Sequence, residues 1–543
     1  MFPQHVDHLI LNEDNPLVPH SEGIFRQQSR LNMIDKELFP VLSIHKQFTD
    51  NKNAVADIVF KLFGNSVPAP QTITDDSTDV NDKVETNDGG RVCSPNSQAS
   101  SSISSLSEPS EPVLDLSYTG QRIRTLPCLK YWLRPLTRLD TSEIDVLDCH
   151  AEQELVQKLP DVDEVFKQTI ARRNEMAGAY GDCTVQDRYP EVVFLGTGSA
   201  VPGKTRNVSG IWINLSPDAA VLFDCGEGTL GQLRRLYGVE ASNHELTRLK
   251  AIFISHLHAD HHLGLCSLIL ARKRALIAAQ MSCEKLFLMA APKLFIMHNL
   301  FSQIMQNVRD LTIRVSPRAM NKNANVQRDR QIALMRAVLG LRSIEVVRVW
   351  HPMMANGYIL TTNCGKRIVY SGDTLPCEDL VQAGKNADLL IHEATMEDSM
   401  ESEAFQKRHC TIGQAVAVAN AMRARHTILT HFSARYGRVP LIGDSLGLNR
   451  SSIQSTDLES NHNDLTSSCR EETGTRERDK FSQRGSVGIA FDFMTVPYYR
   501  LGELEIYIPL LKAMFADYHE QLTDNAYRRE LSKRLELQQA QQA

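Results

Sequence analysis

The sequence lacks the marks of several protein classes. Its 11 cysteines are scattered singly and none forms a CxxC pair, so we expect neither a disulfide framework nor a cysteine-built zinc site. A reducing compartment is the simplest interpretation. An excess of positive charge is also missing, because the net charge is −6. Any binding of nucleic acid must therefore use a local patch of the surface.

Long apolar runs are absent as well. The longest candidates, residues 263–271 and 286–297, are short or interrupted, whereas a membrane span needs roughly 18–20 apolar residues. We therefore expect no membrane contact. The first thirty residues include Asp7, Glu13 and Asp14, and they resemble neither a signal peptide nor an acid-poor transit peptide. No targeting segment is visible in this chain.

The composition changes along the chain and indicates several units. A chain of 543 residues is too long for one ordinary core. Two stretches, residues 64–112 and about 445–486, are rich in Ser, Thr, Asn and Asp, and they contain too few apolar residues to offset the entropy of ordering. We expect both to be disordered, the first as a linker and the second as an insert. The remaining expected units are residues 1–63, a bridging segment with a helix at 113–189, a catalytic α/β domain at 190–500, and a helix with a tail at 501–543.

Short apolar runs in the α/β domain alternate with polar loops. They predict buried strands that each deliver a loop, and Gly226 and Gly238 mark the start and end of a helix. Helical spacing is also present at residues 152–176. The expected strands are residues 192–195, 211–215, 221–224, 251–255, 367–371, 388–391, 427–430 and 487–496.

One of these strands runs into a dense cluster of metal-binding residue types, His256, His258, Asp260 and His261. Two histidines separated by one residue in an extended turn can face the same ion, and the Asp-His pair that follows can reach a second ion. Zinc takes nitrogen and carboxylate ligands, and catalytic zinc sites keep a position open for water. A histidine-rich surface turn is the alternative, but a buried strand leads directly into this motif.

Four ligands do not complete two sites, and three further candidates follow apolar strands downstream. These are His351, Asp373 and His431. Parallel sheets build their sites at the carboxyl ends of strands, and the Asp373 carboxylate could bridge two cations. We therefore predict two zinc ions per chain. Such a pair suits phosphodiester cleavage, but it would also serve amide or thioester hydrolysis.

At this point the sequence resembles the tRNase Z family, the endonucleases that process the 3′ end of transfer RNA. The resemblance is carried by Gly196-Thr197-Gly198, by Asp224-Cys225-Gly226-Glu227-Gly228 and by the histidine cluster. The PxKxR loop of the family appears at Pro202, Lys204 and Arg206, its HEAT motif at His392-Glu393-Ala394-Thr395, and its HST loop at His409-Cys410-Thr411, with Cys in place of Ser.

The resemblance implies a metallo-β-lactamase αββα sandwich, preceded here by a partial domain remnant. It points to the long eukaryotic form, with residues 1–63 as the end of the amino-terminal half and most of that half missing. Only 21 residues separate His351 from Asp373. That is too few for the arm with which short family members grip the tRNA elbow. A monomer in the nucleus, the mitochondrion or both is also implied.

The resemblance further implies roles for single residues. One zinc would be held by His256, His258, His351 and Asp373, and the other by Asp260, His261, Asp373 and His431. Asp224 would orient the ligating histidines. Asp260 would orient or deprotonate the attacking water, and His409, paired with Glu393, would protonate the departing 3′ oxygen. The implied substrate is precursor tRNA, contacted through Pro202, Lys204 and Arg206.

Several alternatives remain open from the sequence. A hydrolase of the same fold that acts on a small phosphodiester or a thioester would keep the metals without needing the PxKxR or HEAT motifs. A non-enzymatic RNA-binding relic would be expected to have lost ligands, and none is lost. The PxKxR loop could be only a basic turn, and Glu393 with His409 could be only a structural ion pair.

Overall fold

The structure, a computed structural model, describes residues 8–10, 22–42, 122–124, 130–132, 138–140, 149–180, 184–304, 306–317, 326–352, 354–434 and 485–518. The chain falls into two compact units, residues 1–12 with 51–125 and residues 13–50 with 126–543. In the first unit, β1 (His8–Ile10) pairs in parallel with β2 (Arg122–Arg124). In the second unit, β3 (Lys130–Trp132) pairs with β4 (Arg138–Asp140). The linker expected at 64–112 and almost all of the insert expected at 445–486 lie outside the described residues.

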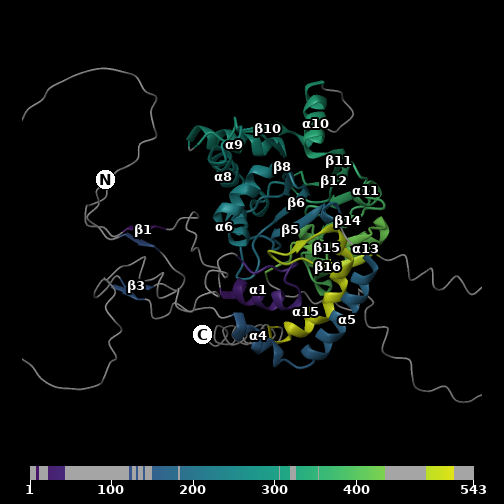
Figure 1. Ribbon diagram of the computed structural model, residues 1–543. Coiled ribbons are helices and arrows are strands. Elements are labelled where there is room, and N and C mark those ends of the chain that lie inside the picture. Colours follow the sequence, from purple (N-terminus) through teal and green to yellow (C-terminus); the bar gives the residue numbers. More distant parts are fainter. Residues whose placement is uncertain are drawn as a thin grey trace, which may run out of the picture. The chain divides into compact units, whose positions relative to one another are not determined.

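Two sheets form the centre of the second unit (Figure 1). One has seven strands in the order β10-β9-β8-β7-β6-β5-β17, and the other has six in the order β11-β12-β13-β14-β15-β16. The strands of the first are β5 (Glu191–Gly196), β6 (Gly210–Ser216), β7 (Ala219–Phe223), β8 (Leu249–Phe253), β9 (Leu286–Met289), β10 (Thr312–Val315) and β17 (Thr495–Val496). Those of the second are β11 (Leu341–Arg348), β12 (Asn356–Thr362), β13 (Arg367–Tyr370), β14 (Leu389–Glu393), β15 (His426–Thr430) and β16 (Ser486–Ile489).

Three apolar layers show how the sheets and helices pack. The largest joins inward side chains of both sheets, such as Phe223 and Tyr358, whose rings stack 6.1 Å apart. A second layer lies between the seven-stranded sheet and α6 (Thr229–Arg248), α8 (Leu265–Ala278) and α9 (Pro292–Ile304). A third lies between the six-stranded sheet and α11 (Glu378–Ala383) and α13 (Ile412–Met422). Helices therefore cover both outer faces, and the expected αββα sandwich is confirmed.

The strand expected at residues 487–496 is in fact two strands in different sheets. β16 pairs with β15 in the six-stranded sheet, whereas β17 pairs with β5 in the seven-stranded sheet. Residues 490–494 cross between the sheets and are buried. An apolar run gave no sign of this crossing, because both faces of each strand are covered and the burial pattern has no period of two.

Helix boundaries differ from the expectation in two places. Helical spacing at residues 152–176 is divided between α4 (Cys149–Gln157) and α5 (Val162–Tyr180), with Pro160 in the break. Gly238 interrupts α6 with φ 80° and ψ 171°, but a second helical stretch continues to Arg248. The remaining helical elements are α1 (Glu22–Ile34), η2 (Val185–Arg188), α7 (Ala259–His262), α10 (Val326–Leu339), η4 (Asp398–Met400), α12 (Glu401–Lys407), η7 (Tyr498–Tyr507) and α15 (Ile508–Met514). Among the described residues, none of the helices is long and apolar enough to cross a membrane.

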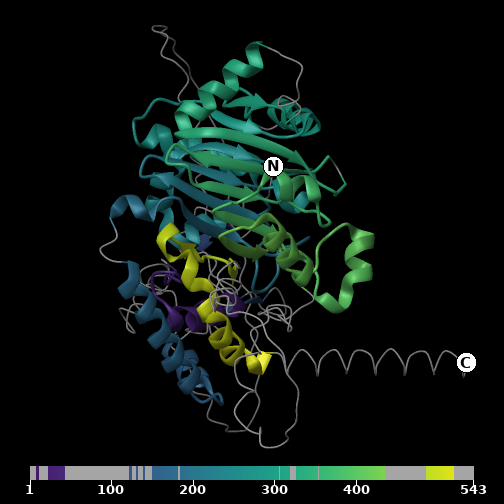
Figure 2. The same ribbon diagram turned by 90° about the vertical axis from the view of Figure 1, so that its right-hand side faces the viewer.

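The segment from α1 to Leu42 packs into the sandwich, although the sequence suggested a separate remnant ending at residue 63. Leu31 and Phe39 are fully or almost fully buried in the central core, and the ring of Phe39 meets Phe491 edge-on at 6.3 Å. The Thr495 backbone N–H donates to the Leu38 carbonyl. Figure 2 shows α5 in blue beside the yellow carboxy-terminal elements η7 and α15, which pack against it.

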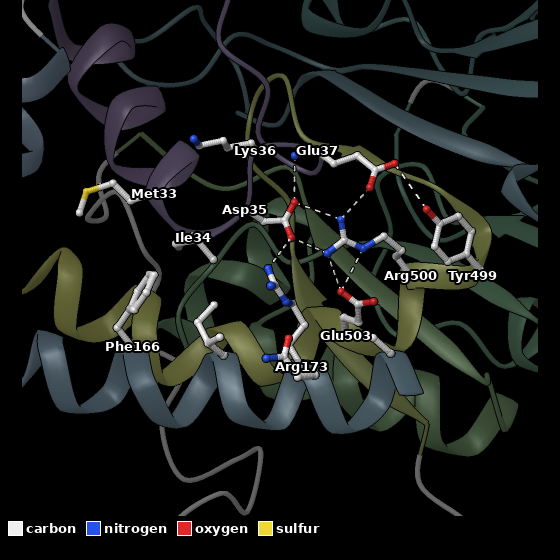
Figure 3. A pocket seen from close by; sticks show the side chains of 13 residues that line it. Met33, Ile34, Asp35, Lys36, Glu37, Phe166, Arg173, Tyr499, Arg500 and Glu503 are labelled. Carbon is white, nitrogen blue, oxygen red and sulfur yellow. Dashed lines mark hydrogen bonds and ion pairs between the residues drawn. The ribbon is translucent and has the colours of Figure 1, made fainter. Parts of the chain in front are cut away.

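Charged residues also join α1 to η7, around the pocket shown in Figure 3. The Arg500 guanidinium donates to Asp35 and to Glu503, and all three side chains are buried. Arg173 of α5 contacts the same Asp35 carboxylate at 3.3 Å. The amino-terminal segment and the carboxy-terminal elements are thus parts of the same folded domain.

Candidate metal centre

Loops from both sheets meet at one edge of the sandwich and bring the seven predicted ligands together. His256 to His261 follow β8 of the seven-stranded sheet, and α7 begins inside this motif. His351, Asp373 and His431 follow β11, β13 and β15 of the other sheet. A close approach fixes the loop between β7 and α6 against this motif, because a Cβ on Gly226 would lie 2.2 Å from the Asp260 carbonyl oxygen.

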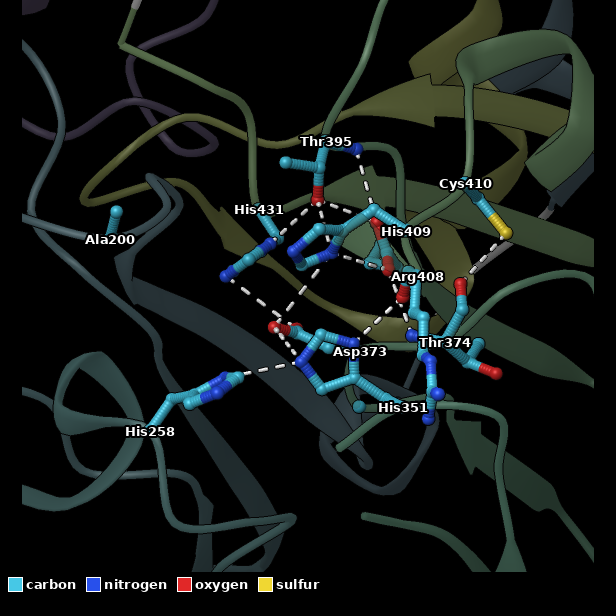
Figure 4. Close-up of polar contacts among 12 residues, drawn as sticks. Ala200, His258, His351, Asp373, Thr374, Thr395, Arg408, His409, Cys410 and His431 are labelled. Carbon is cyan, nitrogen blue, oxygen red and sulfur yellow. Dashed lines mark hydrogen bonds and ion pairs between the residues drawn. The ribbon is translucent and has the colours of Figure 1, made fainter. Parts of the chain in front are cut away.

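The first group of donor atoms belongs to His256, His258, His351 and Asp373, which can place one ligand atom each within 4.8 Å of one another. His258 Nδ1 lies 2.8 Å from His256 Nε2 and 3.1 Å from His351 Nε2. Asp373 Oδ2 lies 3.6 Å from His256 Nε2. Three imidazoles and one carboxylate therefore converge on one point (Figure 4 shows His258, His351 and Asp373).

A second group comprises Asp260, His261 and His431, all buried. The Nε2 atoms of His261 and His431 lie 3.5 and 3.4 Å from Asp260 Oδ2. The same two nitrogens lie 3.3 and 3.5 Å from oxygens of Asp373. Asp373 thus touches both groups, which is the position of a carboxylate that bridges two cations.

The chemistry of these residues fits a metal. His261 Nε2 is buried without a hydrogen-bond partner, although it points toward two carboxylates. Burial and neighbouring histidines hold the pKa of His256 well below its usual range. Burial would raise the pKa of Asp373, but His431 and His261 outweigh it and lower that pKa. Neutral imidazole and ionised carboxylate are the forms that bind zinc.

Hydrogen bonds behind the donor groups orient the rings. Asp224, in a left-handed conformation at the end of β7, lies 2.8 Å from His261 Nδ1 and accepts from the hydroxyls of Ser255 and Tyr370. Thr395 Oγ1 lies 2.8 Å from His431 Nδ1. The sequence predicted such a role for Asp224. The sequence did not indicate the roles of Ser255, Tyr370 and Thr395. Each hydroxyl contacts Asp224 or His431 only in the folded structure, and no sequence pattern predicts these contacts.

His409 pairs with Glu393 and also belongs to a third group that could hold a metal ion, with Asp373 and His431. His409 Nδ1 lies 2.9 Å from Glu393 Oε1, and it lies 3.9 Å from Asp373 Oδ2. Glu393 also accepts from the backbone N–H of Thr374 and from the Thr395 hydroxyl. Burial would lower the pKa of His409, but Glu393 and Asp373 outweigh it and raise that pKa to about 9. The Glu393 carboxylate therefore favours the protonated form of this imidazole.

The Pro202–Arg206 loop is fixed to the centre but differs from the expectation. The neighbouring Ala200 N–H donates to Asp260 Oδ2 at 2.7 Å, and Pro202 and Lys204 are exposed. Arg206, by contrast, is buried. Its guanidinium donates to the Thr197 hydroxyl and the Ala490 carbonyl, and it lies over the ring of Phe432 at 4.7 Å. Arg206 thus supports the loop from inside, and the predicted phosphate contact does not fit its position.

The paired sheets, the covering helices and the site at their edge are those of the metallo-β-lactamase fold. Residues 219–432 match the family model described as a Beta-lactamase superfamily domain. This chain is 36% identical over 408 residues to Zinc phosphodiesterase ELAC protein 2 of Rattus norvegicus. The matched region covers 74% of this chain and 44% of that protein.

Two further similarities concern ribonuclease Z. The chain is 38% identical over 352 residues to "Ribonuclease Z, mitochondrial" of Drosophila melanogaster, covering 64% of this chain and 40% of that protein. A crystal structure of a long form RNase Z from yeast is 25% identical with a TM-score of 0.49, covering 62% of this chain and 45% of that one. The relatives' names confirm the resemblance to the tRNase Z family, and the chain spans less than half the length of these relatives.

Proposed function

We propose that this protein is a zinc-dependent endoribonuclease that removes the 3′ trailer from precursor tRNA. The products would be a tRNA with a free 3′ hydroxyl and a trailer with a 5′ phosphate. One observation carries the proposal: two groups of metal-binding side chains meet at Asp373, with the His409–Glu393 pair beside them. The names of the relatives, zinc phosphodiesterase and ribonuclease Z, support the same chemistry.

Two zinc ions per chain would complete the centre. His256, His258, His351 and Asp373 would hold one, and Asp260, His261, Asp373 and His431 would hold the other. Two zinc ions lower the pKa of a water molecule and stabilise both the attacking and the leaving oxygen of an in-line displacement.

The side chains of this protein would complete the reaction. Asp260, held by the Ala200 N–H, would orient the attacking water or accept its proton. His409, kept protonated by Glu393, would donate to the 3′ oxygen as the P–O bond breaks. The exposed Lys204 would contact a phosphate of the RNA beside Pro202.

The chain supplies no arm for the tRNA elbow between His351 and Asp373. Residues 356–370 are occupied by β12, a turn and β13, which pair as an antiparallel hairpin inside the six-stranded sheet. The grip on the body of the tRNA would therefore come from elsewhere in the molecule. We propose a monomer without membrane contact that works in the mitochondrion, the nucleus or both, and the Drosophila relative's name supports the mitochondrion.

The decisive experiment is to incubate the purified, zinc-loaded protein with a precursor tRNA and to map both new ends. Cleavage at the junction of tRNA and trailer, with a 3′ hydroxyl on the tRNA fragment, is expected. A small phosphodiester and a thioester are assayed in parallel. Hydrolysis of either small substrate without any cleavage of the precursor would favour the alternative, a superfamily hydrolase with another substrate.

A further inference from the structure

Two residues whose backbones are linked to the metal centre carry large, exposed aromatic side chains. The side chain of Trp350 is 64% exposed and that of Phe405 is 70% exposed. Single exposed apolar residues are ordinary on a protein surface, so exposure alone carries no meaning. These two differ from the others in their backbone connections, because Trp350 directly precedes His351 and Phe405 is linked to His351 through Arg408.

The backbone of Trp350 is held in place beside the ligand groups. Its N–H donates to the Thr374 hydroxyl at 3.1 Å, and its carbonyl accepts from the Leu375 N–H at 3.2 Å. The residues on either side of this contact are themselves part of the centre, since His351 follows Trp350 and Asp373 precedes Thr374. These two hydrogen bonds therefore fix the backbone that carries the exposed Trp350 indole beside the candidate ligands.

Phe405 lies on α12, and its backbone is linked to the centre through Arg408. Arg408, left-handed with φ 59°, ends this helix, and its N–H donates to the Phe405 carbonyl. The Arg408 carbonyl in turn lies 2.7 Å from His351 Nδ1, which donates to it. The Arg408 residue is exposed, and Figure 4 shows the dashed line between its carbonyl and the His351 ring. The backbone of Phe405 is thus linked to His351 through Arg408, one turn of the chain away.

Exposed aromatic rings and a guanidinium are the groups that bind single-stranded nucleic acid, the rings by stacking on bases and the guanidinium by pairing with phosphate. The reaction identifies which nucleotide they face. The oxygen that leaves is the 3′ oxygen of the nucleotide on the 5′ side of the cut, and His409 donates to it. The sugar of that nucleotide would then lie next to His409, which directly follows Arg408. Arg408 and the two exposed aromatic residues linked to His351 are therefore the candidates for contact with its base and phosphate.

We propose that Trp350 and Phe405 form a stacking platform for the base of the nucleotide on the 5′ side of the cut, with Arg408 on the adjoining phosphate. This inference rests on the proposed function for the choice of nucleotide. The platform would supply a contact with the terminal base at the reacting centre. This chain has no tRNA-gripping arm between His351 and Asp373, so such a contact would add to its hold on the substrate.

The first test pairs protein variants with altered substrates. Trp350→Ala combined with Phe405→Ala should lower kcat/KM on a precursor RNA by about 10–100-fold, the usual effect of losing a stacked base. Most of the loss should be in KM, and Trp350→Phe should retain most of the activity. Leu334→Ala, which removes a half-exposed apolar side chain from α10, is the matched control and should cleave like the wild type.

An RNA with an abasic residue on the 5′ side of the cut should bring the wild type down to the level of the double variant. The double variant itself should lose little more on that RNA. A further full-size loss would show that the rings do not act on this base. An abasic effect found only on the 3′ side of the cut would also overturn the proposal. So would an equal defect of the double variant on a small diester without a base, because the substitutions would then have disturbed His351.

A second test does not depend on cleavage. A short RNA whose scissile 3′ oxygen is replaced by a methylene group should quench tryptophan fluorescence on binding, and Trp350→Phe should abolish most of the quenching. Trp212 is fully buried and should not respond. Quenching without cleavage of the natural RNA would refute the proposed function and leave the platform standing. Cleavage with neither quenching nor an abasic effect would refute the platform alone.

Discussion

The carboxylate of Asp492 accepts two hydrogen bonds from Thr197, one from the backbone N–H at 2.9 Å and one from the hydroxyl at 2.6 Å. Its other oxygen accepts from the Asn207 N–H and the Gln232 amide. Asp492 lies in the crossing between β16 and β17, and Thr197 begins the turn that leads to the Pro202–Arg206 loop. Arg206 donates to the same Thr197 hydroxyl. A buried network therefore ties the start of the loop to a residue 295 positions later in the chain.

This network separates the roles of the two cations in the loop. Arg206→Met should lower the melting temperature, because it leaves the buried Thr197 hydroxyl and Ala490 carbonyl without their donor, a loss of about 1–3 kcal/mol for a buried group left unpaired. Lys204→Ala should leave the melting temperature within error and weaken RNA binding. The slope of log binding constant against log salt should become shallower by about 0.7–0.9, the share of one phosphate contact. An unchanged slope would place Lys204 away from the phosphates.

Metal content tests the ligand set directly. The wild type should contain about two zinc equivalents. His258→Ala should lower this content, because its ring belongs to one donor group, and Asp373→Ala should lower it further, because Asp373 touches both groups. Elemental analysis after gel filtration measures the effect, with His244→Ala, an exposed histidine on α6, as the control. Full zinc content in His258→Ala would remove that residue from the ligands.

Leaving-group chemistry tests His409. His409→Ala should slow turnover by roughly 10²–10⁴-fold, the usual contribution of a positioned proton donor, while zinc content and substrate affinity change little. A substrate with sulfur in place of the scissile 3′ oxygen needs no proton on its leaving group. The variant should regain much of the lost rate on it. An equal defect on both substrates would mean that His409 and Glu393 form only a structural ion pair.

Acid stability should depend on Asp35. Burial would raise the pKa of this carboxyl, but the Arg500 guanidinium outweighs it and lowers the pKa. A lowered folded-state pKa stabilises the fold above the unfolded value of about 3.9, and this stabilisation is lost as the pH falls through the folded-state pKa. Asp35→Asn should therefore lower the melting temperature most near pH 7, and the difference from wild type should shrink below about pH 4. The exposed Asp163→Asn should show no such trend.

The packing of the amino-terminal segment also predicts a measurable loss. Phe39→Ala removes a buried ring from the central core, and such truncations cost about 3–5 kcal/mol. The melting temperature should fall clearly, whereas Lys36→Ala, on an exposed side chain three residues earlier, should have little effect. A tolerated Phe39→Ala would mean that residues 22–42 are an independent remnant after all.

The local sequence was sufficient to find the residues that the structure brings together at the edge of the sheets. His256, His258, Asp260 and His261 lie within six positions after a buried strand, so their proximity follows from chain connectivity alone. The single candidates His351, Asp373 and His431 could be predicted because strands of one sheet end at a common edge. The short-range spacing of residues and the ends of strands can be predicted from the sequence, because neither depends on contacts with distant parts of the chain.

Contacts across long sequence separations were decided only by the tertiary structure. A basic loop looks the same in sequence whether its arginine faces solvent or, like Arg206, lies buried between aromatic rings and a carbonyl. The division of residues 487–496 between two sheets was equally hidden, because strands covered on both faces have no alternating pattern. The place of Phe39 in the core depends on Phe491, which lies more than four hundred positions away, and hydrophobic burial is non-directional, so the sequence shows that such a ring will be covered but not by what.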